Sequence, residues 1–157
     1  MESIYVSEGH YGPFQVLVRS AASTFTVDES LGAGGIGAGP NPFDLLSASL
    51  GSCALMTMRM FALDRRWPLE RVIVRVGHER PSLAERDRFL VEIQILGALD
   101  ARQREELVRV AARSPILLTL TRGSDMEIRT LPDGPVDCTA VSTMTHLNRM
   151  KEAIISR

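Results

Sequence analysis

Apolar and polar residues alternate in five segments of the chain, which is the period of half-buried strands. Residues 14–19 and 24–27 are separated by a short small-residue segment, so they predict a β-hairpin near the start. Residues 69–78 and 88–96 each place branched or aromatic apolar side chains on one face. These two segments predict a second antiparallel pair with one buried face.

A longer apolar stretch, residues 39–66, predicts one long helix that is enclosed on most sides. Asn41 suits the N-cap, Pro42 suits the first helical position, and Asp44 is placed to complete a capping box. Proline at position 68 should end the helix. Because Arg59 and several Ser and Thr residues interrupt the apolar run, the pattern favours a core helix over a membrane span.

The second half of the chain predicts shorter elements. Residues 100–113 predict a helix capped by Asp100, and residues 116–121 a short helix or turn. Residues 125–131 alternate and predict a last strand, and the tail should be helical from about Ser142 and dock on a partner subunit. This order of elements indicates an α+β fold with a mainly antiparallel sheet. One chain of 157 residues has little material to cover the long helix, which favours a homodimer.

Composition narrows the possible partners. The formal net charge is −1, so no basic excess favours nucleic acid or an anionic membrane surface, and we expect neither as a partner. The first residues lack an export signal, and two cysteines 85 positions apart form no disulfide scaffold, so we expect a cytoplasmic protein. His10, His78 and His146 fit no metal motif, and we expect neither a metal nor a cofactor.

A glycine-rich segment, residues 32–39, contains the pattern G-x-G-x-x-G at Gly32, Gly34 and Gly37. A dinucleotide site needs this pattern directly between a parallel strand and the helix that it opens. Here a Gly-Pro-Asn-Pro segment intervenes, and no acidic residue ends a following strand about 20 residues on. The context therefore favours a flexible loop without regular structure over a nucleotide site.

Residues 34–80, GGIGAGPNPFDLLSASLGSCALMTMRMFALDRRWPLERVIVRVGHER, resemble the osmotically inducible protein C (OsmC) family, which includes the organic hydroperoxide resistance proteins. The similarity extends more loosely to residue 131, so residues 1–131 are expected to form an OsmC-like domain and residues 132–157 a partly helical C-terminal extension. The resemblance implies an OsmC-like α+β fold and an intertwined homodimer with its active cysteines at the subunit interface.

Catalytic members of that family use a peroxidatic cysteine, a resolving cysteine and an Arg–Glu pair. By resemblance, Cys53 is the peroxidatic residue, and Ser114 stands at the resolving position. Phe43 stands at the position of the glutamate, with Asp44 beside it, and Arg19 is the nearest candidate for the arginine. Arg59 from across a dimer and Cys138 from the tail are the other candidates, as activating cation and resolving thiol respectively.

These residues favour a thiol-dependent peroxidase that reduces organic hydroperoxides through Cys53. Serine forms no disulfide, so an external thiol would have to reduce the oxidised cysteine unless Cys138 folds back over the helix. The alternative is a non-catalytic OsmC-like dimer that binds an apolar small molecule and has lost the redox relay. A buried, inert Cys53 is the simpler interpretation of a lone helix cysteine, and an interaction module that uses the tail is a third possibility.

Overall fold

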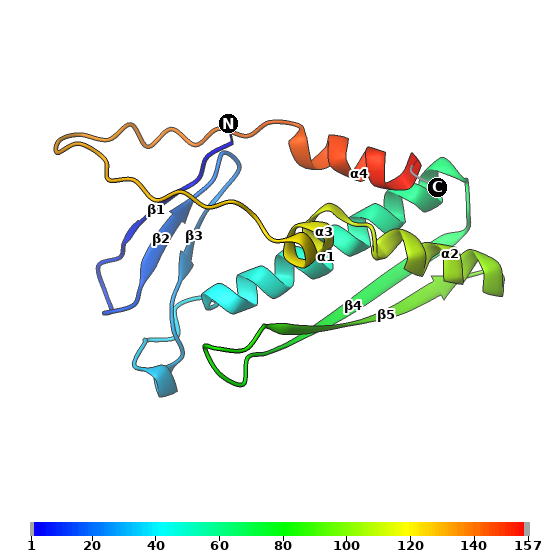
Figure 1. The fold of residues 1–157 in the computed structure, drawn as a ribbon, viewed down its shortest axis with the longest axis horizontal. Helices are drawn as coiled ribbons and strands as arrows, with labels where there is room; N and C mark the ends of the chain where they lie inside the picture. The colour runs from blue at the N-terminus through cyan, green and yellow to red at the C-terminus, as the bar shows by residue number, and fades with distance from the viewer. Residues whose placement is uncertain (1, 156–157) are drawn as a thin grey trace. The chain divides into compact units, whose positions relative to one another are not determined.

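The computed structural model describes residues 2–155 (Figure 1). These residues form two compact units. Unit 1 comprises residues 2–45 and 125–144, and unit 2 comprises residues 46–124 and 145–155. Helices and antiparallel sheets are both present, so the predicted α+β class with antiparallel pairing is confirmed.

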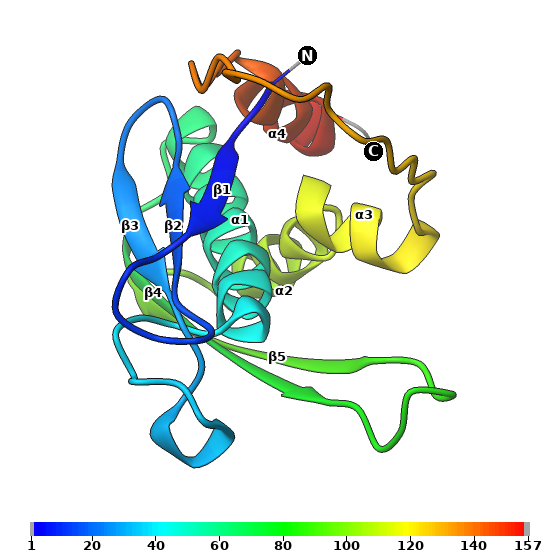
Figure 2. The same cartoon turned by 90° about the vertical axis from the view of Figure 1, so that its left-hand side faces the viewer.

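Unit 1 contains a three-stranded antiparallel sheet, in the order β1-β2-β3 (Figure 2). Strands β2 (Val16–Arg19) and β3 (Thr24–Val27) form the predicted hairpin, in which Val16 lies opposite Val27. Strand β1 (Tyr5–Glu8) adds to β2, and the sequence pattern did not reveal it because most of its side chains are exposed.

The glycine-rich segment is organised by a buried carboxylate, that of Asp28. Its Oδ2 accepts backbone N–H groups from Ile36 at 3.1 Å and from Ala38 at 3.0 Å, and its Oδ1 accepts that of Glu29 at 2.8 Å. These hydrogen bonds, the one from Ala38 foremost, lower the pKa of Asp28. A β-carbon on Gly35 would lie 2.0 Å from the Glu29 carbonyl oxygen, so only glycine fits there.

Two expectations for unit 1 are wrong. The glycine-rich segment is not wholly irregular, since it contains one turn of 3-10 helix, η1 (Leu31–Ala33). The strand predicted over residues 125–131 is absent: these residues have no regular structure, and Met126 and Ile128 are almost fully exposed. Alternation alone does not make a strand, because each strand needs a neighbour to bond its backbone groups, and no described strand pairs with this segment.

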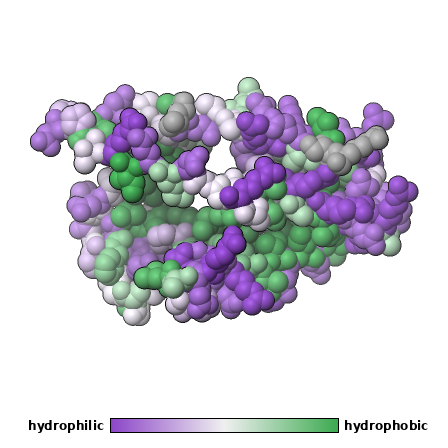
Figure 3. Space-filling view, viewed as in Figure 1, coloured by the Kyte–Doolittle hydropathy of each residue, from purple (hydrophilic) through white to green (hydrophobic). Residues whose placement is uncertain are grey.

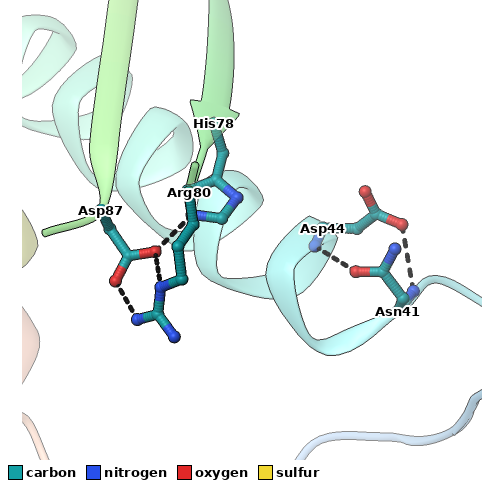
Figure 4. Close-up of polar contacts among 5 residues, drawn as sticks. All are labelled: Asn41, Asp44, His78, Arg80 and Asp87. Atoms are coloured by element: carbon teal, nitrogen blue, oxygen red, sulfur yellow. Dashed lines mark hydrogen bonds and ion pairs between the residues drawn. The ribbon is translucent and has the colours of Figure 1, made fainter. Parts of the chain in front are cut away.

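The long helix is confirmed as α1 (Pro42–Asp64). At its start, the Asn41 N–H donates to the Asp44 carboxylate at 3.0 Å, and the Asp44 N–H donates to the Asn41 side-chain oxygen at 3.0 Å, which is the predicted capping box (Figure 4). By length and composition α1 could also cross a membrane. Its apolar residues, however, pack in a hydrophobic core, as those of a core helix do.

Unit 2 is built around α1 and a long hairpin formed by β4 (Leu69–Glu79) and β5 (Arg88–Gly97), whose register places Val74 opposite Ile93. A β-carbon on Gly51 would lie 3.1 Å from Val76, so glycine lets α1 pack closely on β4. The hairpin also exposes apolar side chains, and Figure 3 shows hydrophobic residues gathered over it; the exposed ones include Ile73, Leu90 and Leu96.

Three shorter helices complete unit 2: α2 (Ala101–Ala111), α3 (Pro115–Arg122) and α4 (Thr145–Ile155). Asp100 caps α2, as predicted, and it also forms a capping box with Gln103. The segment after Ser114 is a helix, and the tail helix starts three residues later than expected. The core of unit 2 joins α1 to α2 and the hairpin through Ala54, Met58, Phe61, Ala62, Leu69, Val72, Leu99, Leu107, Val110 and Ala111.

Candidate functional site

Cys53 lies about three turns into α1, in unit 2, and is buried, with 2% of the residue's surface exposed. It carries a free thiol. The hydroxyl of the buried Thr57 donates to the Cys53 carbonyl oxygen at 2.7 Å, one helical turn further on. The sulfur therefore occupies a fixed place on the inner side of the helix.

The first donor to this sulfur comes from the start of α3. Ser114 is the N-cap, Pro115 the first helical residue, and the backbone N–H of Ile116 donates to Cys53 Sγ at 3.5 Å. A serine N-cap usually accepts this donor or the next with its own hydroxyl, but the Ser114 side chain makes no capping bond here. Cys53 thus takes the place of a capping oxygen, where the helix dipole favours a negative charge.

The second partner of the sulfur is a histidine from the C-terminal helix. His146 Nε2 lies 3.2 Å from Cys53 Sγ, and the protonation of the ring decides which atom donates. His146 is the second residue of α4, and Met150 and Ala153 follow it at helical spacing. Since both are buried, this face of α4 packs against the rest of unit 2, and the imidazole of His146 lies on the same face.

Ser114 is fully buried, and within residues 2–155 its hydroxyl oxygen has no hydrogen-bond partner. An unsatisfied buried hydroxyl is uncommon in native proteins and calls for an explanation. The resemblance places the resolving cysteine at this position, two residues before the amide that contacts Cys53. A thiol without a hydrogen-bond partner at this position would cost less free energy than a hydroxyl without one, because an S–H is a weak donor.

A second ionisable cluster of unit 2 lies at the end of the β4–β5 hairpin (Figure 4). His78 Nε2 is 2.7 Å from Asp87 Oδ1, and the Arg80 guanidinium approaches the same carboxylate with two nitrogens, Nε at 2.8 Å. The hydrogen bond from Arg80, followed by that from His78, lowers the pKa of Asp87. The His78 ring also packs on Phe89, with the ring centroids 4.7 Å apart.

A cavity of about 540 Å³ lies between α1, α3 and the hairpin of unit 2. Its apolar wall includes Leu50, one turn before Cys53, and Leu117, the residue after Ile116. Arg80, Arg86 and Asp87 form its polar end. A mainly apolar cavity of this volume with a few polar groups is typical of small-molecule sites. The other lining residues are Leu46, Glu85, Phe89, Val91, Leu120 and Thr121.

Comparison with known families identifies the chain. A model of the family described as OsmC-like protein matches residues 32–129. The chain belongs to the OsmC-like family. No curated protein matches the sequence.

Solved structures agree with the OsmC-like assignment. An OsmC-like protein from Mycoplasma pneumoniae has a TM-score of 0.65 at 16% identity, over 77% of this chain and 87% of its own. An organic hydroperoxide resistance protein OsmC from Legionella pneumophila has a TM-score of 0.59 at 19% identity, over 76% and 88%. An OsmC-like protein of unknown function from Vibrio cholerae has a TM-score of 0.62 at 13% identity, over 76% and 92%. At these identities the likeness establishes the OsmC-like fold alone.

The other candidate site residues predicted from the sequence of this OsmC-like chain have no described contact with Cys53. Arg19 is exposed at the end of β2, and Asp44 caps α1; both belong to unit 1, as does the exposed free thiol of Cys138. Arg59 donates to the carbonyl oxygens of Leu69 and Glu70, so within the chain it serves to anchor β4 to α1. The role of each in a reaction stays a prediction.

Sequence reasoning missed His146 as a neighbour of Cys53. The two residues are 93 positions apart, and α4 lies beyond the segment that matches the OsmC-like family. The one available signal was the spacing of His146, Met150 and Ala153, which places the histidine on the apolar face of the tail helix. No group of three or more His, Cys, Asp or Glu side chains within residues 2–155 is suited to hold a metal ion.

Proposed function

We propose that this OsmC-like protein reduces organic hydroperoxides, with Cys53 as the nucleophile and an external thiol as the reductant. The observation that carries the proposal is the position of Cys53 Sγ at the N-terminus of α3, where it accepts the Ile116 amide. A thiolate is the attacking species in such chemistry, and a helix N-terminus favours that charge. Family membership and the name of the Legionella relative support a peroxide as the substrate.

In the first step the Cys53 thiolate attacks the terminal oxygen of R–O–OH. The O–O bond breaks, an S–O bond forms, and the sulfur loses two electrons to the peroxide. The products are a sulfenic acid on Cys53 and an alkoxide, which takes up a proton to become the alcohol.

The second step needs a thiol, because Ser114 at the resolving position forms no disulfide. A small thiol R′–SH attacks the sulfenic sulfur and releases water, leaving a mixed disulfide on Cys53. A second R′–SH then displaces Cys53 as a thiol and leaves as R′–S–S–R′. Cys138 is the intramolecular alternative, and a reducing cytoplasm is the compartment that supplies the thiol in this proposal.

The cavity of unit 2 supports an apolar peroxide. Leu50 and Leu117 lie in its wall. Leu50 precedes Cys53 by one helical turn, and Leu117 follows Ile116, whose amide donates to Cys53 Sγ. Burial of a hydrocarbon group gains about 25 cal/mol for each Å² removed from water, so an apolar wall selects bulky organic peroxides over hydrogen peroxide.

A homodimer is part of the proposal. The β4–β5 pair is a two-stranded sheet with apolar side chains exposed on its outer side, and such a pair gains stability from further cover. Analytical ultracentrifugation at micromolar concentration should give twice the mass of the chain. A single species of monomer mass would contradict the dimer. That result would not bear on the thiol chemistry, which the peroxide assay tests separately.

A non-catalytic binding protein is the second candidate, because two observations favour it. Phe43 and Ser114 replace residues that the catalytic members of the family use, and Cys53 is a buried residue. Such a protein would keep the cavity of unit 2 and bind an apolar molecule without turning it over.

The decisive assay follows loss of cumene hydroperoxide under excess dithiothreitol, with wild-type protein, Cys53→Ser and Cys138→Ser. We expect turnover in the wild type and in Cys138→Ser, and none in Cys53→Ser. Binding of cumyl alcohol without turnover in any variant would support the non-catalytic protein. Loss of turnover in Cys138→Ser under limiting dithiothreitol would make Cys138 the resolving thiol.

A further inference from the structure

We propose that His146, carried by the C-terminal helix α4, is the cationic partner of Cys53 in this protein, where the resemblance expects an arginine. The inference rests on the proposed thiol chemistry and adds to it a residue from outside the matched segment, residues 32–129. Under this inference, the C-terminal helix contributes a residue to the site.

The geometry carries the first step. His146 Nε2 and Cys53 Sγ are 3.2 Å apart, which is a hydrogen-bond distance for sulfur, and both atoms belong to unit 2. Cys53 is buried, with 2% of the residue exposed, so water does not compete strongly for a charge on its sulfur. The candidate cation that the sequence offered from the same helix, Arg59, is bonded to two carbonyl oxygens of β4.

The second step is the way α4 holds the ring. Met150 and Ala153 lie one and two turns beyond His146 and are buried, so the helix is fixed along this face. The Ile116 amide approaches the same sulfur from α3. A negative sulfur would therefore be held by one neutral donor from α3 and one charged donor from α4, an arrangement that favours a thiolate–imidazolium pair.

The third step is the path of the proton. The imidazole takes the proton of the Cys53 thiol at Nε2, and the thiolate attacks the terminal peroxide oxygen. When the O–O bond breaks, the imidazolium returns that proton to the alkoxide, which leaves as the alcohol. Charge and protons balance, and His146 ends neutral beside a sulfenic acid. An arginine holds its proton too strongly to supply this step.

The test uses two variants of His146 in a Cys138→Ser background, so that Cys53 is the one thiol. His146→Gln keeps an N–H donor without a charge, and His146→Leu removes both. His10→Gln is the matched control, because His10 is an exposed histidine of unit 1. Far-ultraviolet circular dichroism and thermal unfolding establish that each variant is folded.

Thiolate absorbance at 240 nm and the rate of alkylation by iodoacetamide, both at pH 7, are the readouts. Relative to the Cys138→Ser parent, we expect alkylation about tenfold slower in His146→Leu, an intermediate rate in His146→Gln and no change in His10→Gln. The absorbance should fall in the same order. The absorbance needs no reagent to reach the sulfur, and His146→Gln alone decides the question if His146→Leu does not fold.

Equal absorbance and alkylation in the Cys138→Ser parent and in His146→Gln made on that parent would overturn the inference, even if the parent consumes cumene hydroperoxide. A drop in both readouts, with no peroxide turnover in any protein, would uphold the Cys53–His146 pair and overturn the peroxidase. The two failures are therefore distinguishable.

Discussion

Unit 2 holds two histidines in contrasting surroundings. His78 faces the Asp87 carboxylate, which also receives the Arg80 guanidinium, so charges of both signs are present and matched (Figure 4). His146 faces a sulfur, which also accepts a hydrogen bond from a neutral backbone amide. The first cluster has the composition of a structural ion-pair network, and the second contains a free thiol, which we propose as the nucleophile.

The contrast shows what makes a titratable pair useful for chemistry. A carboxylate that accepts hydrogen bonds from a guanidinium and an imidazole is stabilised in its charged form, and its lowered pKa keeps it charged across the physiological range. A thiol beside an imidazole is the arrangement in which we propose that the ring takes the proton and the sulfur becomes the nucleophile. Contact with a histidine therefore does not by itself mark a reactive site; the chemistry of its partner does.

The largest difference should appear when the proposed nucleophile is removed. Cys53→Ser should lower the rate of cumene hydroperoxide reduction on the order of 10³-fold or more, since serine at neutral pH is a poor nucleophile. Cys138→Ser, the matched change at the exposed cysteine, should keep the wild-type rate under excess dithiothreitol. Equal rates in the two variants would remove Cys53 from the mechanism.

A bulky residue at Gly51 should affect both clusters, because Gly51 lies two residues before Cys53 and packs on Val76, two residues before His78. Gly51→Leu should lower the free energy of unfolding by about 1–3 kcal/mol through overpacking. Gly51→Ala should be nearly neutral, since a gain in helix propensity of about 1 kcal/mol opposes a contact at 3.1 Å. Urea unfolding measures both, and a neutral Gly51→Leu would contradict the close packing of α1 on β4.

Asp87→Asn should act on stability and leave the sulfur unchanged. Because the folded pKa of Asp87 is lowered, its stabilisation is present above the usual carboxyl pKa of about 4 and is lost as the pH falls through the folded value. The variant should therefore lower Tm at pH 7 and weaken the fall of Tm on acidification. Glu79→Gln, at an exposed ion pair with Arg88, is the control. Lower thiolate absorbance at 240 nm in Asp87→Asn would show that the two clusters are coupled.

The smallest effect is expected at Ser114. Its buried hydroxyl has no partner among the described residues, so Ser114→Ala should leave the free energy of unfolding unchanged or raise it by about 1 kcal/mol. Thermal unfolding in the presence of excess dithiothreitol measures this. A loss of more than 1 kcal/mol would mean that the hydroxyl is bonded in solution.

Local patterns predicted most of the secondary structure. Alternation located the β2–β3 and β4–β5 pairs, and cap residues located the starts of α1 and α2, because the physical causes of these elements lie within a few residues. The strand over residues 125–131 was predicted wrongly because a strand also needs a neighbour, which local alternation does not supply.

The candidate site was only partly accessible to the same reasoning. Cys53 was found by resemblance, since the surrounding Gly-x-Cys segment matches the OsmC family. His146 was missed because its contact with Cys53 spans 93 positions and depends on how α4 packs within unit 2. Asp28 was missed for a related reason: its partners are backbone amides at Ile36 and Ala38, which no side-chain pattern reveals.

The most direct test of the central claim is to map the oxidation of Cys53 by mass spectrometry. The protein is treated with one equivalent of cumene hydroperoxide in the presence of dimedone, which traps a sulfenic acid. The proposed function predicts a dimedone adduct on Cys53 and none on Cys138. An unmodified Cys53 after the peroxide has been supplied at this ratio would contradict the claim that this cysteine is the nucleophile.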